Sequence, residues 1–315
     1  MKILITPRSF ASFSDKPLKM FTERGYEIKR NNTGRPYKKE ELLKLIRDVD
    51  GIIIGIDELS AEIIEEANEL KVISKYGVGL DNIDINKATN KKIVVTNTPT
   101  ANVDAVADLT FGLILSLARR ITEANKKTKS GKWGKIIGKS VWEKTLGVIG
   151  LGRIGRQVVK RAKGFEMNIL AFDIVKDKKF VQKYGIKYVN LEKLLRKSDY
   201  ITIHIPLNDA TRNMISYEEL EKMKKDAFLV NTSRGGIVDE EALYDALRNN
   251  KLRGAALDVY NNEPLRESPL KELDNVIMTP HIGAYTEEAI ENMSIQAAQN
   301  LIDVLEGKEP QNRVN

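Results

Sequence analysis

The sequence predicts an α/β protein with two Rossmann-like domains, each built on a parallel β-sheet. Short apolar runs alternate with amphipathic helical patterns along the whole chain, which is typical of parallel strands joined by helices. Several runs are continuous stretches of β-branched residues, as expected for strands covered on both faces. The length, 315 residues, is enough for two separate cores.

The composition argues against several classes of protein. The chain has no cysteine, so it has no disulfide framework, thiolate nucleophile or cysteine metal site. The N-terminus lacks the apolar stretch of a signal peptide, and the most apolar run, Leu109 to Ala118, is too short to cross a bilayer. The net charge is +7, but lysines and glutamates alternate along helical faces instead of clustering. We therefore expect a cytoplasmic protein with no nucleic-acid partner, no membrane partner and no bound metal.

Five strands are expected within the first hundred residues. They lie at 2–6, 26–30, 51–55, 71–76 and 92–97. Amphipathic helices are expected between them, among them Lys38–Val49 and Ala61–Asn68. This alternation predicts one parallel α/β domain.

A long helix is expected after this domain, from Ala101 to Lys126. Pro99 and Thr100 punctuate the chain just before it. Apolar residues cover most of its circumference, so the helix needs burial on several sides. Packing within the domain and packing against a second subunit explain this comparably well. On the second explanation the chain is a homodimer through residues 101–126.

A second alternating series starts at Thr145. Its strands are expected at 145–150, 168–173, 200–205, 228–232, 254–259 and 275–279. A last helix, from Thr286 to Glu306, follows this series and can pack back on the first domain. The chain therefore crosses between domains near Thr98–Ala101 and again near Gly283–Tyr285.

The stretch TLGVIGLGRIGR holds Gly150, Gly152 and Gly155 in the spacing G-x-G-x-x-G. It follows an expected strand and opens an expected helix, the context of a dinucleotide-binding turn. Gly150 permits the tight turn, Gly152 lacks a Cβ that would block a pyrophosphate, and Gly155 lets the helix pack close to the strand. The next strand ends in Asp173, where a carboxylate can bond both ribose hydroxyls and repel a 2′-phosphate. These residues predict NAD as the cofactor, in preference to NADP.

Bound NAD suggests hydride transfer, which needs a group that exchanges the hydroxyl proton and a cation for the oxygen or carboxylate. The chain has two histidines, His204 and His281, and each follows or ends an expected strand. Arg234, Glu263 and His281 follow three successive strands, whose ends meet at one edge of a parallel sheet. A carboxylate fixes the tautomer of a neighbouring imidazole, and arginine offers a planar fork for a carboxylate or carbonyl. A lone histidine is more often structural, but these three residues together predict an acid–base site.

Six stretches in fixed order resemble the D-isomer-specific 2-hydroxyacid dehydrogenase family along nearly the whole chain. They are KYGVGLDNID (75–84), NTPTANVDAVADLTFGLILSLAR (97–119), TLGVIGLGRIGR (145–156), NTSRGGIVDEEAL (231–243), GAALDVYNNEP (254–264) and TPHIGA (279–284). The resemblance implies a flavodoxin-like substrate domain of residues 1–99 plus 285–315 and an NAD-binding Rossmann domain of residues 100–284. It also implies a small anionic 2-hydroxy or 2-oxo acid as substrate.

The resemblance assigns a role to each matching residue. It implies that His281 exchanges the substrate's hydroxyl proton, that Glu263 pairs with His281, and that Arg234 binds the 2-oxo oxygen and carboxylate. Backbone N–H groups of Val78 and Gly79 are implied to hold the substrate carboxylate. Positions that match the family's NAD contacts are Thr98, Arg153, Ile154, Ile205, Thr232, Ser233, Asp258 and Ala284, with Asp258 on the nicotinamide carboxamide.

Within the family the chain looks most like the phosphoglycerate dehydrogenase branch, which implies 3-phosphoglycerate and 3-phosphohydroxypyruvate as substrates. That branch commonly has a phosphate-binding arginine at the position of Lys75, and lysine keeps the charge but loses the bidentate fork. Arg8, after the first strand, is a second candidate for this contact. Reduction of glyoxylate or hydroxypyruvate therefore stays open. So does an NAD-sensing binding protein like the C-terminal-binding corepressors, although the unclustered charge argues against it.

Overall fold

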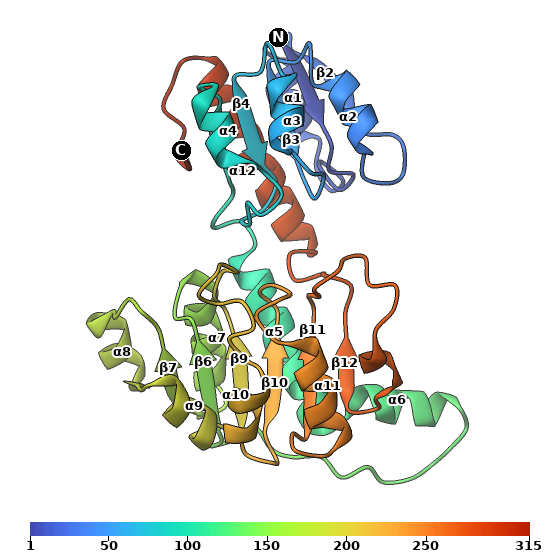
Figure 1. Cartoon of the computed structure of the whole chain (residues 1–315), viewed down its shortest axis with the longest axis vertical. Coiled ribbons are helices and arrows are strands. Elements are labelled where there is room, and N and C mark those ends of the chain that lie inside the picture. The colour runs from blue at the N-terminus through green and yellow to red at the C-terminus, as the bar shows by residue number, and fades with distance from the viewer. The chain divides into compact units, whose positions relative to one another are not determined.

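The computed structural model describes residues 1–315 and contains two compact units (Figure 1). The first unit comprises Met1–Asn102 together with Ala284–Asn315, and the second comprises Val103–Gly283. The chain therefore completes the second unit before it returns to the first for its last helix.

The first unit is a five-stranded parallel sheet with helices on both faces. Its strand order is β2-β1-β3-β4-β5, the flavodoxin-like order of doubly wound sheets. The strands are β1 (Lys2–Ile5), β2 (Glu27–Arg30), β3 (Gly51–Ile54), β4 (Val72–Lys75) and β5 (Val94–Thr96). The helices are α1 (Lys16–Thr22), α2 (Lys39–Leu45), α3 (Ala61–Glu65), α4 (Ile85–Asn90) and α12 (Glu287–Leu305). Apolar residues of α2, α3 and α4 cover one face, and those of α1 and α12 cover the other.

The second unit is a seven-stranded parallel sheet with the order β12-β11-β10-β9-β6-β7-β8. This is the dinucleotide-binding strand order extended by one strand. The strands are β6 (Thr145–Ile149), β7 (Asn168–Phe172), β8 (Ile186–Tyr188), β9 (Tyr200–Ile203), β10 (Phe228–Asn231), β11 (Gly254–Leu257) and β12 (Val276–Met278). The helices are α5 (Val103–Arg119), α6 (Ile121–Lys129), α7 (Arg153–Lys163), α8 (Lys178–Tyr184), α9 (Leu191–Lys197), α10 (Tyr217–Lys222), α11 (Glu240–Arg248) and a 3-10 turn at Pro269–Glu272. Helices α5 and α7 cover one face, and α9, α10 and α11 cover the other. The two sheets confirm the predicted fold class.

One local prediction was wrong, and one strand was missed. The helix expected from Ala101 to Lys126 is two helices, because Arg120 has a left-handed backbone (φ 53°) that an α-helix cannot continue through. The edge strand β8 was not predicted, because its three residues carry too little periodicity to be recognised.

Helix α5 is buried within its own unit. Its residues from Ala107 to Ala118 join one core cluster with α7 and with strands of the sheet. Of the two explanations for its apolar surface, packing within the unit is therefore sufficient. The exposed apolar side chains of this region come later, on α6 and the segment 130–142. They are Ile121, Trp133, Ile137 and Trp142.

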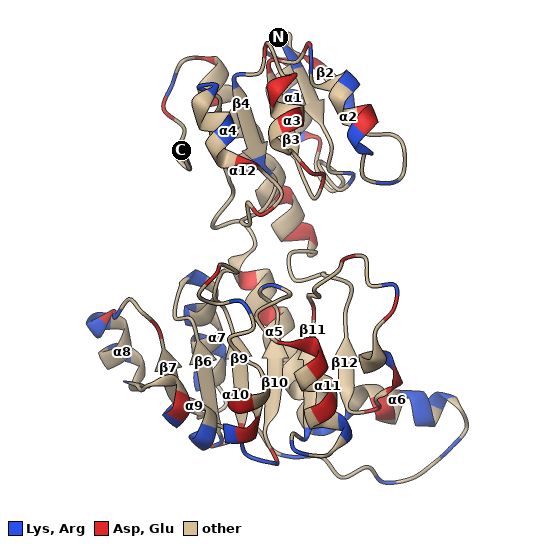
Figure 2. Ribbon diagram, in the orientation of Figure 1, with Lys and Arg blue, Asp and Glu red and all other residues tan.

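Acidic and basic residues occur on helices of both units (Figure 2). Several form pairs one helical turn apart, such as Glu192 with Arg196 and Glu218 with Lys222. No helix is both long enough and apolar enough to cross a membrane.

Candidate functional site

The glycine-rich turn joins β6 to α7. At two of its glycines, Gly150 and Gly155, there is no room for a larger residue. Gly150 has φ +93°, and a Cβ on it would lie 2.4 Å from the His204 carbonyl oxygen at the end of β9. A Cβ on Gly155 would lie 2.1 Å from the Gly150 carbonyl oxygen. The turn and the helix therefore approach each other closely, backbone against backbone.

Gly152 differs from the other two, because a Cβ on it would meet nothing within 4 Å. It is the N-cap residue of α7, and no side chain caps this helix. The N–H groups of the first turn, including those of Arg153 and Ile154, are therefore available to an anion. Open space beside an uncapped helix N-terminus is what the pyrophosphate of a dinucleotide needs, so these residues fit NAD.

The carboxylate of Asp173, one residue beyond β7, is fixed by the backbone around it. One oxygen accepts the Leu151 N–H at 2.6 Å, and the other accepts the Val175 N–H at 2.8 Å. Each carboxylate oxygen has a second lone pair that can accept from a ribose hydroxyl. The strand end, the turn and the acid are thus held in one arrangement.

Three of the other expected NAD contacts form hydrogen bonds within the protein. The Thr232 hydroxyl lies 2.8 Å from the Thr110 hydroxyl, and the Ser233 hydroxyl donates to Asn231 Oδ1 at 2.8 Å. Ile205 packs against the Gly150 turn. Two more belong to the first unit: Thr98, which accepts the Gly77 N–H, and Ala284, which follows Gly283 in the chain.

His281 and Glu263 form a hydrogen-bonded pair beyond the ends of β12 and β11. The distance from His281 Nδ1 to Glu263 Oε2 is 2.6 Å, and Glu263 Oε1 accepts the Tyr260 N–H at 2.9 Å. Burial on its own raises the pKa of Glu263. The contacts with His281 and Tyr260 and the charge of Arg234 outweigh burial and leave the pKa of Glu263 below its ordinary value. Glu263 is therefore an anion that holds the imidazole through Nδ1 and leaves Nε2 for another partner.

Asp258 organises the turn that carries His281. Its side chain is fully buried and accepts the Ile282 and Gly283 N–H groups at 2.8 Å each and the Thr279 hydroxyl at 2.6 Å. His281 itself has a left-handed backbone (φ 52°), an unfavourable conformation for a residue with a Cβ. The Asp258 contacts hold the turn in this conformation.

Arg234 follows β10 in a turn braced by Asn231. The buried Asn231 amide accepts the Ser233 N–H at 3.0 Å and donates to the Arg234 carbonyl at 2.8 Å. The Arg234 guanidinium donates to the Ser233 carbonyl at 2.6 Å. Its positive charge lowers the pKa of Glu263, so the arginine and the His281–Glu263 pair belong to one electrostatic site.

The two histidines differ in chemistry. His204 Nε2 lies 2.9 Å from the Thr202 hydroxyl, while its buried Nδ1 has no hydrogen-bond partner. Burial lowers the pKa of His204 to about 3, so this ring stays neutral near neutral pH. Of the two, His281 is the histidine with a carboxylate partner.

In the first unit, Val78 and Gly79 lie in the turn after β4. Gly77 and Thr98 fix this turn from one side through two hydrogen bonds of 3.0 Å, and Asn97 Nδ2 donates to the Val78 carbonyl at 3.0 Å. The N–H groups of Val78 and Gly79 donate to no group of the protein. Two adjacent free N–H groups in a fixed turn suit an anion such as a carboxylate.

Lys75, at the end of β4, is buried and engaged. Its ammonium donates to the Gly55 carbonyl at 2.5 Å and to Asn82 Oδ1 at 2.6 Å. The Asn82 amide in turn donates to the carbonyls of Gly55 and Asp57 at 3.0 and 2.5 Å. A substrate phosphate would therefore compete with these oxygens for the Lys75 ammonium.

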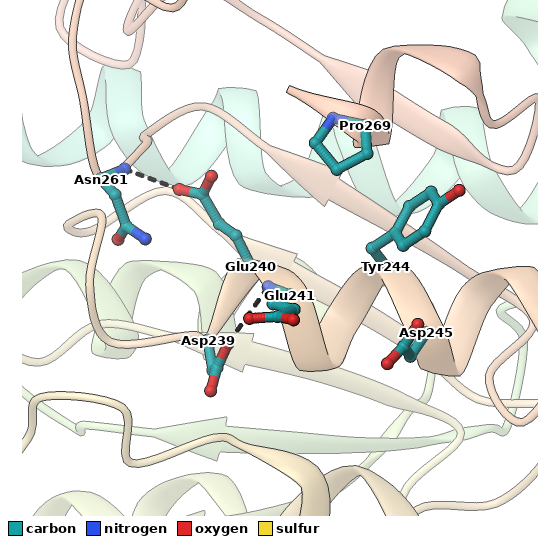
Figure 3. A pocket seen from close by; sticks show the side chains of 7 residues that line it. All are labelled: Asp239, Glu240, Glu241, Tyr244, Asp245, Asn261 and Pro269. Atoms are coloured by element: carbon teal, nitrogen blue, oxygen red, sulfur yellow. Dashed lines mark hydrogen bonds between the residues drawn. The ribbon is translucent and has the colours of Figure 1, made fainter. Parts of the chain in front are cut away.

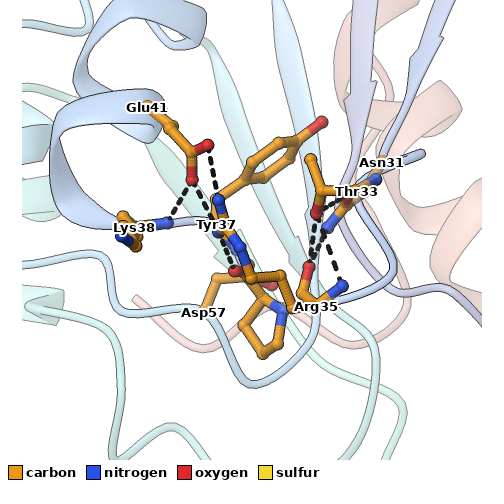
Figure 4. Close-up of polar contacts among 8 residues, drawn as sticks. Asn31, Thr33, Arg35, Tyr37, Lys38, Glu41 and Asp57 are labelled. Carbon is orange, nitrogen blue, oxygen red and sulfur yellow. Dashed lines mark hydrogen bonds and ion pairs between the residues drawn. The ribbon is translucent and has the colours of Figure 1, made fainter.

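Arg8 is exposed, and its guanidinium donates to the Gly34 carbonyl in the loop after β2. Figure 4 shows how this loop is ordered. Arg35 forms two hydrogen bonds of 2.8 Å with Glu41, and buried Asp57 accepts the Tyr37 N–H at 2.7 Å. The guanidinium of Arg8 has four further N–H groups, so this residue can still bind an anion.

Two asparagines that hold predicted site residues, one in each unit, were missed by sequence reasoning. Asn231 and Asn82 hold Arg234 and Lys75 through their amides. The signal for Asn231 was available, because an asparagine two residues before a serine at a strand end favours an Asx turn. Asn82 gave no such signal, because its partners, which follow β3 or end β4, are brought to it only by the fold.

Comparison with protein-family models matches residues 111–283 to the D-isomer specific 2-hydroxyacid dehydrogenase, NAD binding domain. The chain is 47% identical over 281 residues to D-3-phosphoglycerate dehydrogenase of Methanocaldococcus jannaschii, covering 88% of this chain and 54% of the relative. It is 43% identical over 303 residues to glyoxylate reductase of Thermococcus litoralis, covering 93% of this chain and 92% of the relative. The chain thus spans about half the length of the first relative and nearly all of the second.

A solved structure of similar fold is D-lactate dehydrogenase from Aquifex aeolicus, complexed with NAD and lactic acid. It matches with a TM-score of 0.87 at 29% identity, over 99% of this chain and 98% of that chain. The likeness therefore extends over both units.

Proposed function

Because the chain belongs to the D-isomer-specific 2-hydroxyacid dehydrogenase family, we propose that it transfers a hydride between NAD and C2 of a small 2-hydroxy or 2-oxo acid. Its second unit is an NAD-binding domain of this family. The observation that carries the proposal is the 2.6 Å hydrogen bond between His281 and Glu263, in one electrostatic site with Arg234. NAD supplies the hydride acceptor in oxidation and, as NADH, the hydride donor in reduction.

His281 is the acid–base residue of this proposal. Glu263 occupies Nδ1, so Nε2 is the atom that takes the hydroxyl proton during oxidation and returns it during reduction. The Glu263 carboxylate stabilises the imidazolium that forms when the proton arrives. In reduction the same pair delivers the proton to the oxygen of the 2-oxo acid as the hydride arrives at C2.

Arg234 and the turn after β4 are the proposed anion contacts of the substrate. The guanidinium of Arg234 binds the 2-oxo oxygen and the carboxylate, and polarises the carbonyl toward hydride. The free N–H groups of Val78 and Gly79 hold the carboxylate. Asp173 and the first turn of α7 bind the adenosine ribose and the pyrophosphate of NAD.

The phosphorylated pair 3-phosphoglycerate and 3-phosphohydroxypyruvate is the proposed substrate. It is supported by the identity to a D-3-phosphoglycerate dehydrogenase and by the cations Lys75 and Arg8 of the first unit. A specific observation favours a second candidate, the reduction of glyoxylate or hydroxypyruvate. The Lys75 ammonium is already bound to Gly55 and Asn82, and a glyoxylate reductase matches nearly the whole chain.

A homodimer is also proposed, through a contact region that shares only residues 121–126 with the one first expected. Helix α5 is covered within its own unit, whereas Trp133 is 94% exposed and Ile137 is 80% exposed. Apolar side chains with this exposure suit a subunit contact through α6 and residues 130–142. The cytoplasmic location stays a prediction.

The first experiment is an assay of purified protein with NADH and each of four 2-oxo acids. These are 3-phosphohydroxypyruvate, hydroxypyruvate, glyoxylate and pyruvate, and NADH absorbance reports turnover. A large kcat/KM preference for the phosphorylated acid supports the phosphoglycerate assignment. A preference for glyoxylate or hydroxypyruvate supports the second candidate. Binding of NADH without turnover of any acid would overturn the dehydrogenase proposal and favour an NAD-sensing protein.

A further inference from the structure

A cavity of about 590 Å³ lies beside the N-terminal half of α11 (Figure 3). Its lining includes three acidic residues at the start of the helix, Asp239, Glu240 and Glu241, together with Asn261 of the loop after β11. An acidic lining alone identifies no ligand. However, Glu240 makes a contact across this cavity that Glu241 does not make.

Glu240 ties α11 to the loop that carries Glu263. Its Oε1 accepts the Asn261 N–H at 2.6 Å, as Figure 3 shows. A carboxylate that accepts from an amide N–H at this distance forms a charge-assisted hydrogen bond, which is stronger than a neutral one. The tie acts on the backbone of the loop, two residues before Glu263.

The same loop contacts the turn that carries Arg234. A Cβ on Gly235 would lie 2.0 Å from the Tyr260 carbonyl oxygen and 2.7 Å from the Asn261 nitrogen. Next to this contact, the Tyr260 N–H donates to Glu263 Oε1. A shift of residues 260 and 261 would therefore move the carboxylate that holds His281.

We propose that Glu240 is a positioning residue, which holds the 260–263 loop so that Glu263 meets His281 Nδ1. This inference rests on the proposed function, because it concerns the same acid–base pair. Glu240 touches neither substrate nor cofactor in this proposal. It acts through the Asn261 backbone on Glu263, and through Glu263 on His281.

The chain offers a conservative variant and a matched control. Glu240→Gln keeps an acceptor oxygen on the same side-chain length, whereas Glu240→Ala removes it. Glu241→Ala removes a neighbouring carboxylate of the same cavity, from a residue that donates a hydrogen bond through its backbone N–H and makes none through its side chain. The control therefore reports what the loss of one acidic residue from this cavity does by itself.

Two readouts separate positioning from a general loss of structure. The first is kcat and KM with the preferred 2-oxo acid. We expect Glu240→Ala to lower kcat about tenfold with little change in the KM for NADH, since acid–base catalysis depends on alignment. The second is the low-field proton signal of the His281 Nδ1–H, recorded by NMR with histidine-labelled protein. Only two histidines contribute to this spectrum, and His281→Ala assigns the signal.

The expected result is that Glu240→Ala loses or shifts the Nδ1–H signal and lowers kcat, while Glu240→Gln and Glu241→Ala behave like the wild type. An unchanged signal and kcat in Glu240→Ala would overturn the inference, and so would an equal effect of Glu241→Ala. If the wild-type protein turns over none of the four acids, the proposed function fails by itself. The Nδ1–H signal of the same variants then decides the positioning role without any assay of activity.

Discussion

Substituting Gly152 and Gly155 one at a time tests whether the turn after β6 is built for a dinucleotide. In Gly155→Ala the new Cβ would lie 2.1 Å from the Gly150 carbonyl oxygen, more than 1 Å inside normal contact. Because that neighbour is backbone, α7 must shift away from β6. Overpacking of this kind costs about 1–3 kcal/mol of unfolding free energy or more. For a domain of this size we expect Tm to fall by roughly 3–10 °C.

Gly152→Ala gives the opposite expectation. Its Cβ enters space with no protein atom within 4 Å, so the free energy of unfolding should change by less than about 0.5 kcal/mol. The same methyl group would occupy the position where the pyrophosphate approaches the backbone. We therefore expect the Kd for NADH to rise at least about tenfold, which corresponds to about 1.4 kcal/mol.

The assay combines thermal unfolding of the protein without cofactor with titration of NADH by its fluorescence. Wild-type protein and the two variants are compared at one ionic strength. Equal destabilisation by both substitutions would show that Gly152 is packed like Gly155. Unchanged NADH affinity in a fully folded Gly152→Ala would refute the assignment of the pyrophosphate to this turn.

Four further predictions concern single side chains. Asp173→Ala should narrow the preference for NADH over NADPH, measured as the ratio of kcat/KM values, because the carboxylate repels a 2′-phosphate; an unchanged ratio would remove Asp173 from the ribose site. His281→Ala should lower kcat at least about 10²-fold while NADH still binds, and full activity would refute the acid–base assignment. Lys75→Ala should raise KM for 3-phosphohydroxypyruvate more than for hydroxypyruvate. Equal effects on the two KM values would show that Lys75 does not bind the substrate phosphate. Burial lowers the pKa of His204 to about 3 in the folded protein, whereas the pKa in the unfolded chain is near 6.5. Below pH 6.5 the unfolded chain therefore binds a proton that the folded protein does not, and the folded protein loses stability as the pH falls toward 3. Between pH 6.5 and 4 the wild type should therefore lose about 2–3 kcal/mol more unfolding free energy than His204→Gln in denaturant titrations, and parallel pH curves would contradict the burial of this ring.

Sequence reasoning succeeded where the chemistry is local. The glycine turn could be interpreted because a strand, three spaced glycines, a helix and an acid lie within thirty residues. The break in the long helix could not, because Arg120 takes a left-handed backbone that arginine seldom adopts and no glycine marks it. The contact region proposed for the dimer also changed, for a different reason. Apolar periodicity shows that α5 is buried, but it cannot distinguish burial under its own unit from burial under another subunit.

The sequence also could not predict that the Lys75 ammonium is hydrogen-bonded to Gly55 and Asn82. Its partners lie at the end of β3 and in the turn after β4, and the parallel pairing of β3 with β4 brings them together. A lysine at a strand end looks equally available to substrate and to carbonyl oxygens until that pairing is known. The choice between the two proposed substrate classes therefore involves a contact that only the folded first unit defines.

The His281–Glu263 pair depends on strand register in the same way. Leu257 of β11 lies opposite Met278 of β12, so the chain leaves both strands at the same level of the sheet. The Tyr260 hydroxyl lies between the two exits, 3.0 Å from the Leu257 carbonyl oxygen and 2.9 Å from the Thr279 carbonyl oxygen, and shares its one hydrogen between them. A register slip of one residue would displace one exit by about 3.3 Å, more than the 2.6 Å that separates His281 Nδ1 from Glu263 Oε2. The geometry of the His281–Glu263 pair is therefore a consequence of how the last two strands pair, and the loops after them only complete it.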